Sequence, residues 1–267
     1  MPGSFKTEGV VLRSIRFGEA DRILHLYTAE RGRVNAIAKG SRRPKSRFGG
    51  RLEPFFRLDL MLHEGRSELC TVTGAATVDG YPRLRSDGDA IGAAARACDT
   101  VLRLLDSAEP NRPAYSLLCR YLALLDRRAG EAAAAASGRN GGAGPGSGRN
   151  GEATGPESGR GGRAAALAFR IKLALAAGFA PELGSCARCG EREGLTSFSG
   201  AAGGVVCASC EAGSYPISPA ARRFMASAVS RPIAELPEAG EGALRQVERA
   251  IGDTLAHHAH VNLRAVA

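Results

Sequence analysis

Residues 58–63 are Leu-Asp-Leu-Met-Leu-His, and this stretch decides how the first part of the chain folds. Leucine occupies every second position, which is typical of a β-strand with one buried face. Segments with similar strand character surround it, at 9–14, 22–28, 34–38 and 69–78. Five short strands joined by compact turns predict a small closed barrel or sandwich.

After Pro82 the sequence pattern changes from strands to helices. Ser86 or Asp87 can cap the first helix. Apolar residues spaced by threes and fours predict helices over 87–105, 113–125 and 163–177, a helix opened by Pro219, and a last helix over 241–265. We therefore expect an α+β fold, with a barrel domain at 1–83 and a helical domain at 84–267.

A stretch rich in glycine and alanine, residues 130–163, interrupts the helical pattern. The unit Ser-Gly-Arg-Asn-Gly occurs in it twice, at 137–141 and 147–151. Almost none of its side chains can be buried, so we expect the stretch to be disordered. It either separates two domains or is a loop inserted within one helical domain.

Four cysteines form two close pairs, Cys186-Ala-Arg-Cys189 and Cys207-Ala-Ser-Cys210, with 17 residues between the pairs. Two intervening residues let both sulfurs of a turn point at one ion, and two such turns complete a tetrahedron of thiolates. The spacing predicts a zinc module over 183–213. A four-thiolate site leaves no open coordination position, so we expect a structural Zn2+.

The alternative for these cysteines is a pair of disulfides. The start of the sequence has no apolar signal-peptide core, and clustered cysteines in a reducing cytosol bind metal more often than they cross-link. We therefore expect a cytoplasmic protein with a bound metal. The remaining cysteines, which are scattered among apolar residues, are expected to be buried thiols: Cys70, Cys98 and Cys119.

The chain has a net charge of +9 and a pI of about 9.6, which favours a polyanionic partner. Positive charge is concentrated in residues 39–51, the cationic loop, which has six cations and no acid. These cations are Lys39, Arg42, Arg43, Lys45, Arg47 and Arg51. Glycines and a proline predict a loop between strands, and flexible cations can follow a phosphate backbone. Nucleic-acid contact is the favoured interpretation, and a solvated charge run is the alternative.

Phe48 lies within the cationic loop. Its ring could stack on an unpaired base, in a contact worth about 1–3 kcal/mol. A small barrel with a basic loop and an aromatic residue suits single-stranded nucleic acid. Packing of the ring against the barrel is the alternative, and it is favoured for Phe48 taken alone.

No catalytic constellation stands out in the sequence, and we expect a protein that is not an enzyme. Asp87 and Asp89 form a close acidic pair such as a nuclease gathers around a divalent ion, but helix capping explains the pair better. His257, His258 and His260 are expected to lie at an exposed helix end. No run of 18 apolar residues occurs, so we expect no membrane span.

Five segments follow one another in the first eighty or so residues: Glu8-Gly9-Val10-Val11-Leu12-Arg13, Gly18-Glu19-Ala20-Asp21-Arg22-Ile23, Gly32-Arg33, Ala38-Lys39-Gly40-Ser41-Arg42-Arg43 and Ser46-Arg47-Phe48-Gly49-Gly50-Arg51-Leu52-Glu53-Pro54. In order and spacing they resemble the opening of the bacterial RecO recombination-mediator family. Beyond residue 85 the match is architectural: a helical domain, a four-cysteine module and more helix.

The resemblance implies an N-terminal OB-fold barrel, a helical domain and a zinc-ribbon-like element. It implies binding of single- and double-stranded DNA, annealing of complementary strands and, with RecR, loading of RecA onto DNA coated with single-strand binding protein (SSB). The acidic, hydrophobic C-terminal tail of SSB would be a further partner, and the bacterial nucleoid the location. By position, the cationic loop would contact DNA and the four cysteines would be zinc ligands. The stretch 130–163 would be an insertion between helices that still pack together.

Two other functions stay open at this point. A zinc-ribbon RNA-binding or transcription-associated adaptor would prefer RNA over DNA of equal length. A nucleic-acid-processing enzyme would form product in the presence of magnesium, and it would lose that activity when Asp87 and Asp89 are changed.

Overall fold

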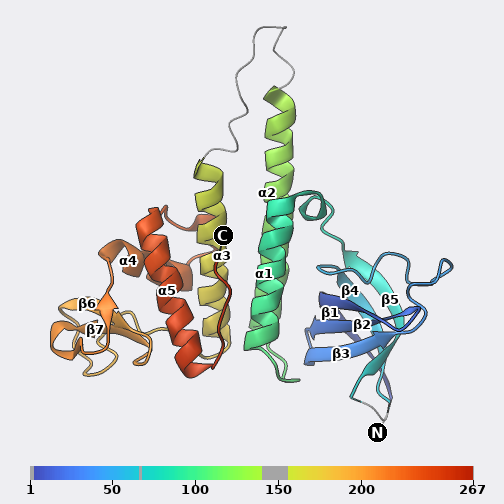
Figure 1. The fold of residues 1–267 in the computed structure, drawn as a ribbon, viewed down its shortest axis with the longest axis horizontal. Helices are drawn as coiled ribbons and strands as arrows, with labels where there is room; N and C mark the ends of the chain where they lie inside the picture. The colour runs from blue at the N-terminus through green and yellow to red at the C-terminus, as the bar shows by residue number, and fades with distance from the viewer. Residues whose placement is uncertain (1–2, 66–67, 140–155, 267) are drawn as a thin grey trace. The chain divides into compact units, whose positions relative to one another are not determined.

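The computed structural model of the chain describes residues 3–65, 68–139 and 156–266. The chain divides into two compact units, Met1–Arg127 and Arg128–Ala267 (Figure 1). The first unit holds a barrel and helices, and the second holds helices and the cysteine module. The strands of the first unit lie before residue 83 and its helices after it. The expected domain boundary at this residue stays a prediction.

The first unit contains a closed barrel with the strand order β1-β2-β3-β5-β4 (Figure 1). The strands are β1 (Ser4–Phe17), β2 (Asp21–Thr28), β3 (Gly32–Ala38), β4 (Arg57–His63) and β5 (Cys70–Asp79). Neighbouring strands are antiparallel except β3 and β5, which pair in parallel through Ala36 and Cys70. The expected OB-like barrel followed by helices is confirmed.

Alternation along the strands builds the barrel core, because every second side chain points inward. Leu58, Leu60 and Leu62 are fully buried, and they belong to one core cluster with Leu24 and Leu26 of β2. Burial of each leucine contributes roughly 1.5–3 kcal/mol. The barrel is thus stabilised by the same leucine alternation from which it is predicted.

Two helices follow the barrel after a short 3-10 turn, η1 (Leu84–Ser86). They are α1 (Gly88–Leu104) and α2 (Arg112–Arg139). Asp87 caps α1, because its carboxylate accepts a hydrogen bond from the Ala90 amide at 2.8 Å. This use of Asp87 agrees with the capping interpretation of the Asp87–Asp89 pair.

The turn between β2 and β3 requires glycine at position 32. Gly32 has a φ of +55°, and a Cβ there would lie 2.2 Å from the carbonyl oxygen of Glu109. Next to it, the Arg33 amide donates to the Ser107 carbonyl at 3.1 Å. This close approach joins the segment after α1 to the closed end of the β2–β3 hairpin.

The second unit packs three helices against one another, with a short 3-10 turn between the last two (Figure 1). They are α3 (Pro156–Ala176), α4 (Pro219–Ser230) and α5 (Glu241–His258), and the turn is η3 (Ile233–Glu235). α4 begins at Pro219 as expected, and the Ser218 hydroxyl caps it by accepting from the Ala221 amide at 3.2 Å. None of the helices in the described ranges is both long and apolar enough to cross a membrane.

α5 ends at His258 rather than continuing to the expected end near residue 265. The chain turns at His260, which has a φ of +55°, and the following segment is held by tertiary contacts. The buried Arg170 guanidinium donates to the Arg264 carbonyl, and the Glu248 carboxylate accepts from the Val266 amide. These contacts, which a helical continuation would break, explain the early end of the helix.

The stretch 130–163 differs from the expectation at both ends, because α2 continues to Arg139 and α3 already begins at Pro156. Residues 132–136 are all alanine, the residue with the highest helix propensity, and extending an existing helix needs no new nucleus. In α3, Arg163 is held by Glu248 at 2.5 Å. The middle of the stretch, 140–155, lies outside the described residues, so the disorder expected there stays a prediction.

Candidate metal centre and nucleic-acid interface

A three-stranded sheet with the order β7-β6-β8 carries the cysteines of the second unit. Its strands are β6 (Leu195–Ser199), β7 (Gly204–Cys207) and β8 (Tyr215–Pro216). Cys207 ends β7, and the 3-10 turn η2 (Ala208–Cys210) supplies the second cysteine of that pair. The first pair lies in the loop before β6, where the Ala187 amide donates to the Val205 carbonyl at 2.8 Å. This bond docks the loop onto β7.

The sulfur atoms of the four cysteines expected to bind zinc lie within 4.8 Å of one another. They belong to Cys186, Cys189, Cys207 and Cys210. The sulfurs of Cys189 and Cys207 are 3.7 Å apart. A tetrahedron with metal–sulfur distances of about 2.3 Å has edges of about 3.8 Å, so the cluster fits one tetrahedral ion. The expected clustering is confirmed, and the group can hold a metal ion.

Backbone and side-chain contacts hold the two cysteine turns in place. Gly190 has a φ of +80°, which suits glycine, and its amide donates to the Cys186 carbonyl at 2.8 Å. The Arg188 guanidinium donates to the Cys210 carbonyl at 2.7 Å. The second contact links one turn to the other, so the protein itself contributes to the arrangement of the sulfurs.

Hydrogen bonds favour a thiolate at one of the four cysteines. Burial opposes ionisation of Cys186, but amide groups, including that of Cys207 at 3.4 Å, lower the pKa of Cys186 to about 6. Hydrogen bonds to the sulfurs of Cys189 and Cys207 raise the pKa of Cys210 to about 12. A bound cation would favour ionisation of the other cysteines as well, because a metal ion deprotonates the thiols that coordinate it. Its positive charge would also offset the repulsion between the resulting thiolates.

The three other cysteines are buried: Cys70, Cys98 and Cys119. Burial raises the pKa of Cys98 to about 12, and it also raises the pKa of Cys70 and Cys119. Thiols in this state are poor nucleophiles, because the thiolate is the reactive form. Their expected burial is confirmed.

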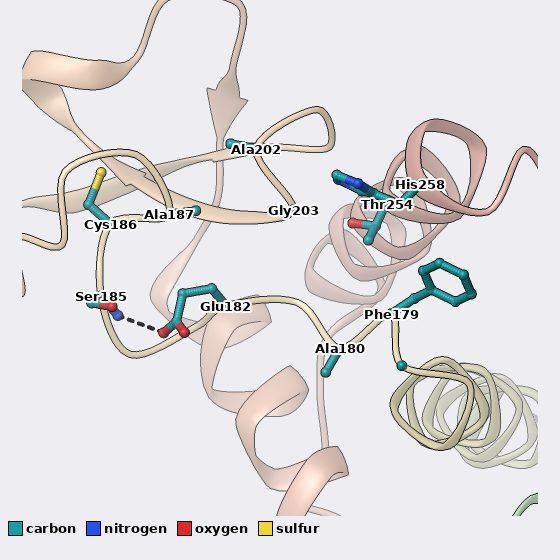
Figure 2. A pocket seen from close by; sticks show the side chains of 11 residues that line it. Phe179, Ala180, Glu182, Ser185, Cys186, Ala187, Ala202, Gly203, Thr254 and His258 are labelled. Atoms are coloured by element: carbon teal, nitrogen blue, oxygen red, sulfur yellow. Dashed lines mark hydrogen bonds between the residues drawn. The ribbon is translucent and has the colours of Figure 1, made fainter.

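A pocket of about 610 Å³ lies beside the cysteine module, lined by part of the segment between α3 and β6, by Ala202 and Gly203 of the turn before β7, and by α5 (Figure 2). The Glu182 carboxylate accepts from the amides of Gly184 at 2.8 Å and Ser185 at 3.0 Å, and these bonds lower its pKa. His258, at the exposed end of α5, donates from Nε2 to the Gly200 carbonyl at 3.0 Å. Both polar groups are therefore engaged in holding the surrounding loops.

The cationic loop joins β3 to β4 in the first unit and is anchored at its start. The Gly40 amide donates to the Asp21 carboxylate at 2.7 Å, and the Arg42 amide donates to the Ala20 carbonyl at 2.8 Å. Both acceptors belong to the β1–β2 hairpin. All six cations of the loop are exposed. The structure thus presents the predicted set of cations to solvent on a segment that is fixed to the barrel.

None of the six cations has a carboxylate within ion-pair distance in the part of the chain that the structure describes. Other arginines of the same unit are paired: Arg22 lies 2.7 Å from Glu53, and Arg57 lies 2.6 Å from Glu8. The positive charge of the cationic loop is therefore not compensated locally. Such a segment attracts anions from solution.

Phe48 differs from the other residues expected to contact nucleic acid, because it is only 2% exposed and belongs to the barrel core. The Arg47 guanidinium lies over its ring, 4.9 Å from the ring centre. Packing against the barrel is therefore the arrangement that the structure shows. The ring anchors the cationic loop and presents no face to a base.

Two exposed apolar side chains at the end of β1 are not among the predicted site residues. Phe17 is 51% exposed and Ile15 is 42% exposed. They alternate with Arg16 just before Gly18, and this period-two pattern could have predicted an apolar face beside the turn. The same hairpin anchors the cationic loop, so Phe17 belongs to the same region of the barrel as the cations.

Two family models match the chain in sequence order. The model described as Recombination protein O N terminal covers residues 1–81, which include the whole barrel. The model described as Recombination protein O C terminal covers 85–137 and 157–266. The segment left unmatched inside the second model lies within the stretch rich in glycine.

Relatives named DNA repair protein RecO align with nearly the whole chain. The relative from Rubrobacter xylanophilus is 37% identical over 262 residues, covering 95% of this chain and 92% of its own length. That from Anaeromyxobacter sp. (strain K) is 34% identical over 268 residues, covering 95% and 91%. That from Nocardioides sp. is 32% identical over 269 residues, covering 98% of each chain. The chain therefore belongs to the RecO family of DNA-repair proteins.

Proposed function

We propose that this protein is a recombination mediator that binds single- and double-stranded DNA and anneals complementary strands. With RecR it helps to load RecA onto SSB-coated single-stranded DNA, and the C-terminal tail of SSB is a further partner. It acts in the bacterial cytoplasm, at the nucleoid, and it is not an enzyme. Membership of the RecO family supports a role in recombinational repair.

The anchored cationic loop is the observation that carries the DNA-binding part of the proposal. Its six cations are exposed, and none has a carboxylate partner among the described residues. Each cation that neutralises a phosphate releases condensed counterions, which favours binding regardless of base sequence. A loop of this kind suits a protein that must act on many different DNA sequences.

Annealing would follow from the same electrostatics. Two complementary strands repel each other through their phosphates, and cations that lie between them reduce this repulsion. The bases then select their own partners by pairing, so the protein supplies no sequence information and needs no nucleotide hydrolysis. Annealing by this route should depend steeply on salt concentration.

Zn2+ is the metal that we propose for the cysteine centre, held by Cys186, Cys189, Cys207 and Cys210. Thiolates are soft ligands that select zinc over hard cations such as magnesium. Four protein ligands leave no position for a substrate, so the ion would be structural. It would cross-link the loop before β6 to the end of β7.

Annealing of two complementary fluorescent oligonucleotides, each precoated with the cognate SSB, tests the proposal directly. Acceleration by the protein without ATP is the expected result. No acceleration, together with tight binding to the bare strands, would reduce the protein to a general nucleic-acid-binding module. A parallel titration with RNA of equal length tests the adaptor alternative, which predicts a preference for RNA.

A further inference from the structure

The outside of the β1–β2–β3 sheet carries an apolar surface next to the β1–β2 turn. The strand register places Ile15 opposite Ile23, and Ile23 opposite Ile37. Phe17 lies two residues beyond Ile15 on the same side of β1, because side chains alternate along a strand. We call Ile15, Phe17, Ile23 and Ile37 the hairpin face.

Packing within the barrel leaves much of the hairpin face exposed to solvent. Phe17 is 51% exposed and Ile15 is 42% exposed, while Ile23 and Ile37 are partly exposed beside them. The adjacent Leu24, which points the other way, is fully buried in the core. A contiguous apolar surface that stays exposed in the folded protein is typical of a binding site.

The cationic loop is joined to this hairpin by a side-chain contact as well as by its backbone. The Arg42 guanidinium donates to the carbonyl of Gly18, the residue after Phe17, at 3.3 Å. Lys39 lies two residues beyond Ile37, directly after the last residue of β3. An exposed aromatic ring therefore lies next to cations that have no carboxylate partner among the described residues, on one side of the barrel.

We infer that Phe17 is a stacking platform for an unpaired base of single-stranded nucleic acid whose phosphates lie along the cationic loop. The inference rests on the proposed DNA binding and adds to it a contact between the Phe17 ring and a base. Single strands present flat apolar bases and a row of negative charges together, which matches a ring beside cations. In a duplex the base faces are covered by their neighbours, so Phe17 would discriminate single strands from double strands.

Paired titrations with normal and abasic strands test this inference. Wild-type protein should bind a normal oligonucleotide more tightly than an abasic strand with the same number of phosphates. Phe17→Ala should weaken binding of the normal strand on the order of tenfold and leave binding of the abasic strand unchanged. Val78→Ala is the matched control, because Val78 is 46% exposed on β5, away from the hairpin face, and should change neither affinity.

Tryptophan fluorescence gives a second readout, because the natural chain contains no tryptophan. Phe17→Trp should retain the affinity of the wild type, and its emission should be quenched when an oligothymidine strand is added. Val78→Trp should show no quenching. Equal losses for normal and abasic strands in Phe17→Ala, or unquenched emission from Phe17→Trp in a bound complex, would overturn the stacking role.

These outcomes are distinct from a failure of the proposed function. If neither strand binds to the wild-type protein, the DNA-binding proposal itself is wrong. If DNA binds in a salt-dependent manner and Phe17→Ala has the affinity of the wild type for both strands, DNA binding stands and the stacking inference is wrong. The hairpin face would then be left for a protein partner.

Discussion

Neutralising half of the cationic loop should halve the salt dependence of single-stranded DNA binding. The variant is the triple substitution Arg42→Gln, Arg43→Gln and Lys45→Gln. All three side chains are exposed, and no carboxylate of the described residues pairs with them. Arg47 is left in place because it lies over the buried Phe48 ring, and changing it would alter packing together with charge.

The size of the effect follows from counterion release. With one phosphate for each of the six cations, log Kobs should fall with log salt concentration with a slope of about −0.7 × 6, or about −4.2. Three remaining cations give a slope of about −2.1. Between about 50 and 200 mM salt, affinity should therefore fall about 300-fold for the wild type and about 20-fold for the variant.

Fluorescence anisotropy of a labelled oligothymidine strand, titrated at several salt concentrations, measures both slopes. The control is Arg223→Gln, Arg231→Gln and Arg245→Gln, three exposed arginines of the second unit with no carboxylate of the described residues at ion-pair distance. It lowers the net charge by the same amount, from +9 to +6. An unchanged slope in the loop variant, or an equal decrease in the control, would refute the argument that the loop itself binds phosphates.

Three further predictions concern stability and metal binding. Cys186→Ser should reduce the amount of metal that the protein binds and speed hydrogen exchange in β6 and β7, while the barrel amides keep their protection. Faster exchange in the barrel would contradict independent units. Leu60→Ala should lower the free energy of unfolding of the first unit, measured in urea, by about 2–5 kcal/mol, because it leaves a cavity in the barrel core. Met61 is exposed, so Met61→Ala should change this free energy far less. Equal losses in the two variants would contradict the assigned barrel register. Burial opposes ionisation of Glu8, yet its hydrogen bond from Arg57 helps to hold the pKa of its carboxyl below the usual value of 4.5. The stability that this carboxylate contributes is present above pH 4.5 and is lost as the pH falls through its folded-state pKa. Free energies of unfolding measured down to pH 3 should therefore fall less steeply in Glu8→Gln than in the wild type.

The features that local sequence predicts correctly are those that depend on near neighbours in the chain. The alternation of Leu58, Leu60 and Leu62 specifies a strand with one buried face wherever the strand is placed. The Cys-x-x-Cys spacing likewise specifies a turn that directs two sulfurs toward one point. For this reason the barrel strands and the cysteine cluster can be predicted from short stretches of sequence alone.

The features that escape prediction depend on contacts between distant segments. Packing against the barrel is favoured for Phe48 taken alone, but the glycines and cations around it do not indicate that the cationic loop folds back over the barrel. The end of α5 is decided by Arg170, far away in the sequence, and the parallel pairing of β3 with β5 closes the barrel without a local pattern. The exposed ring of Phe17 is a different case, because the alternation along β1 is visible in the sequence but the side of β1 that faces solvent is not.

The burial of Phe48 links the packing of the barrel core to the proposed binding of DNA by the cationic loop. Because the ring holds the middle of the cationic loop in place, part of the conformational entropy that the proposed DNA binding would otherwise cost is already lost when the protein folds. A substitution that emptied this position would release the neighbouring cations without removing any of them. Affinity for DNA would then decrease through disorder in the unbound protein. An inherited or engineered change deep in the barrel would resemble a defect in the proposed DNA-binding surface itself.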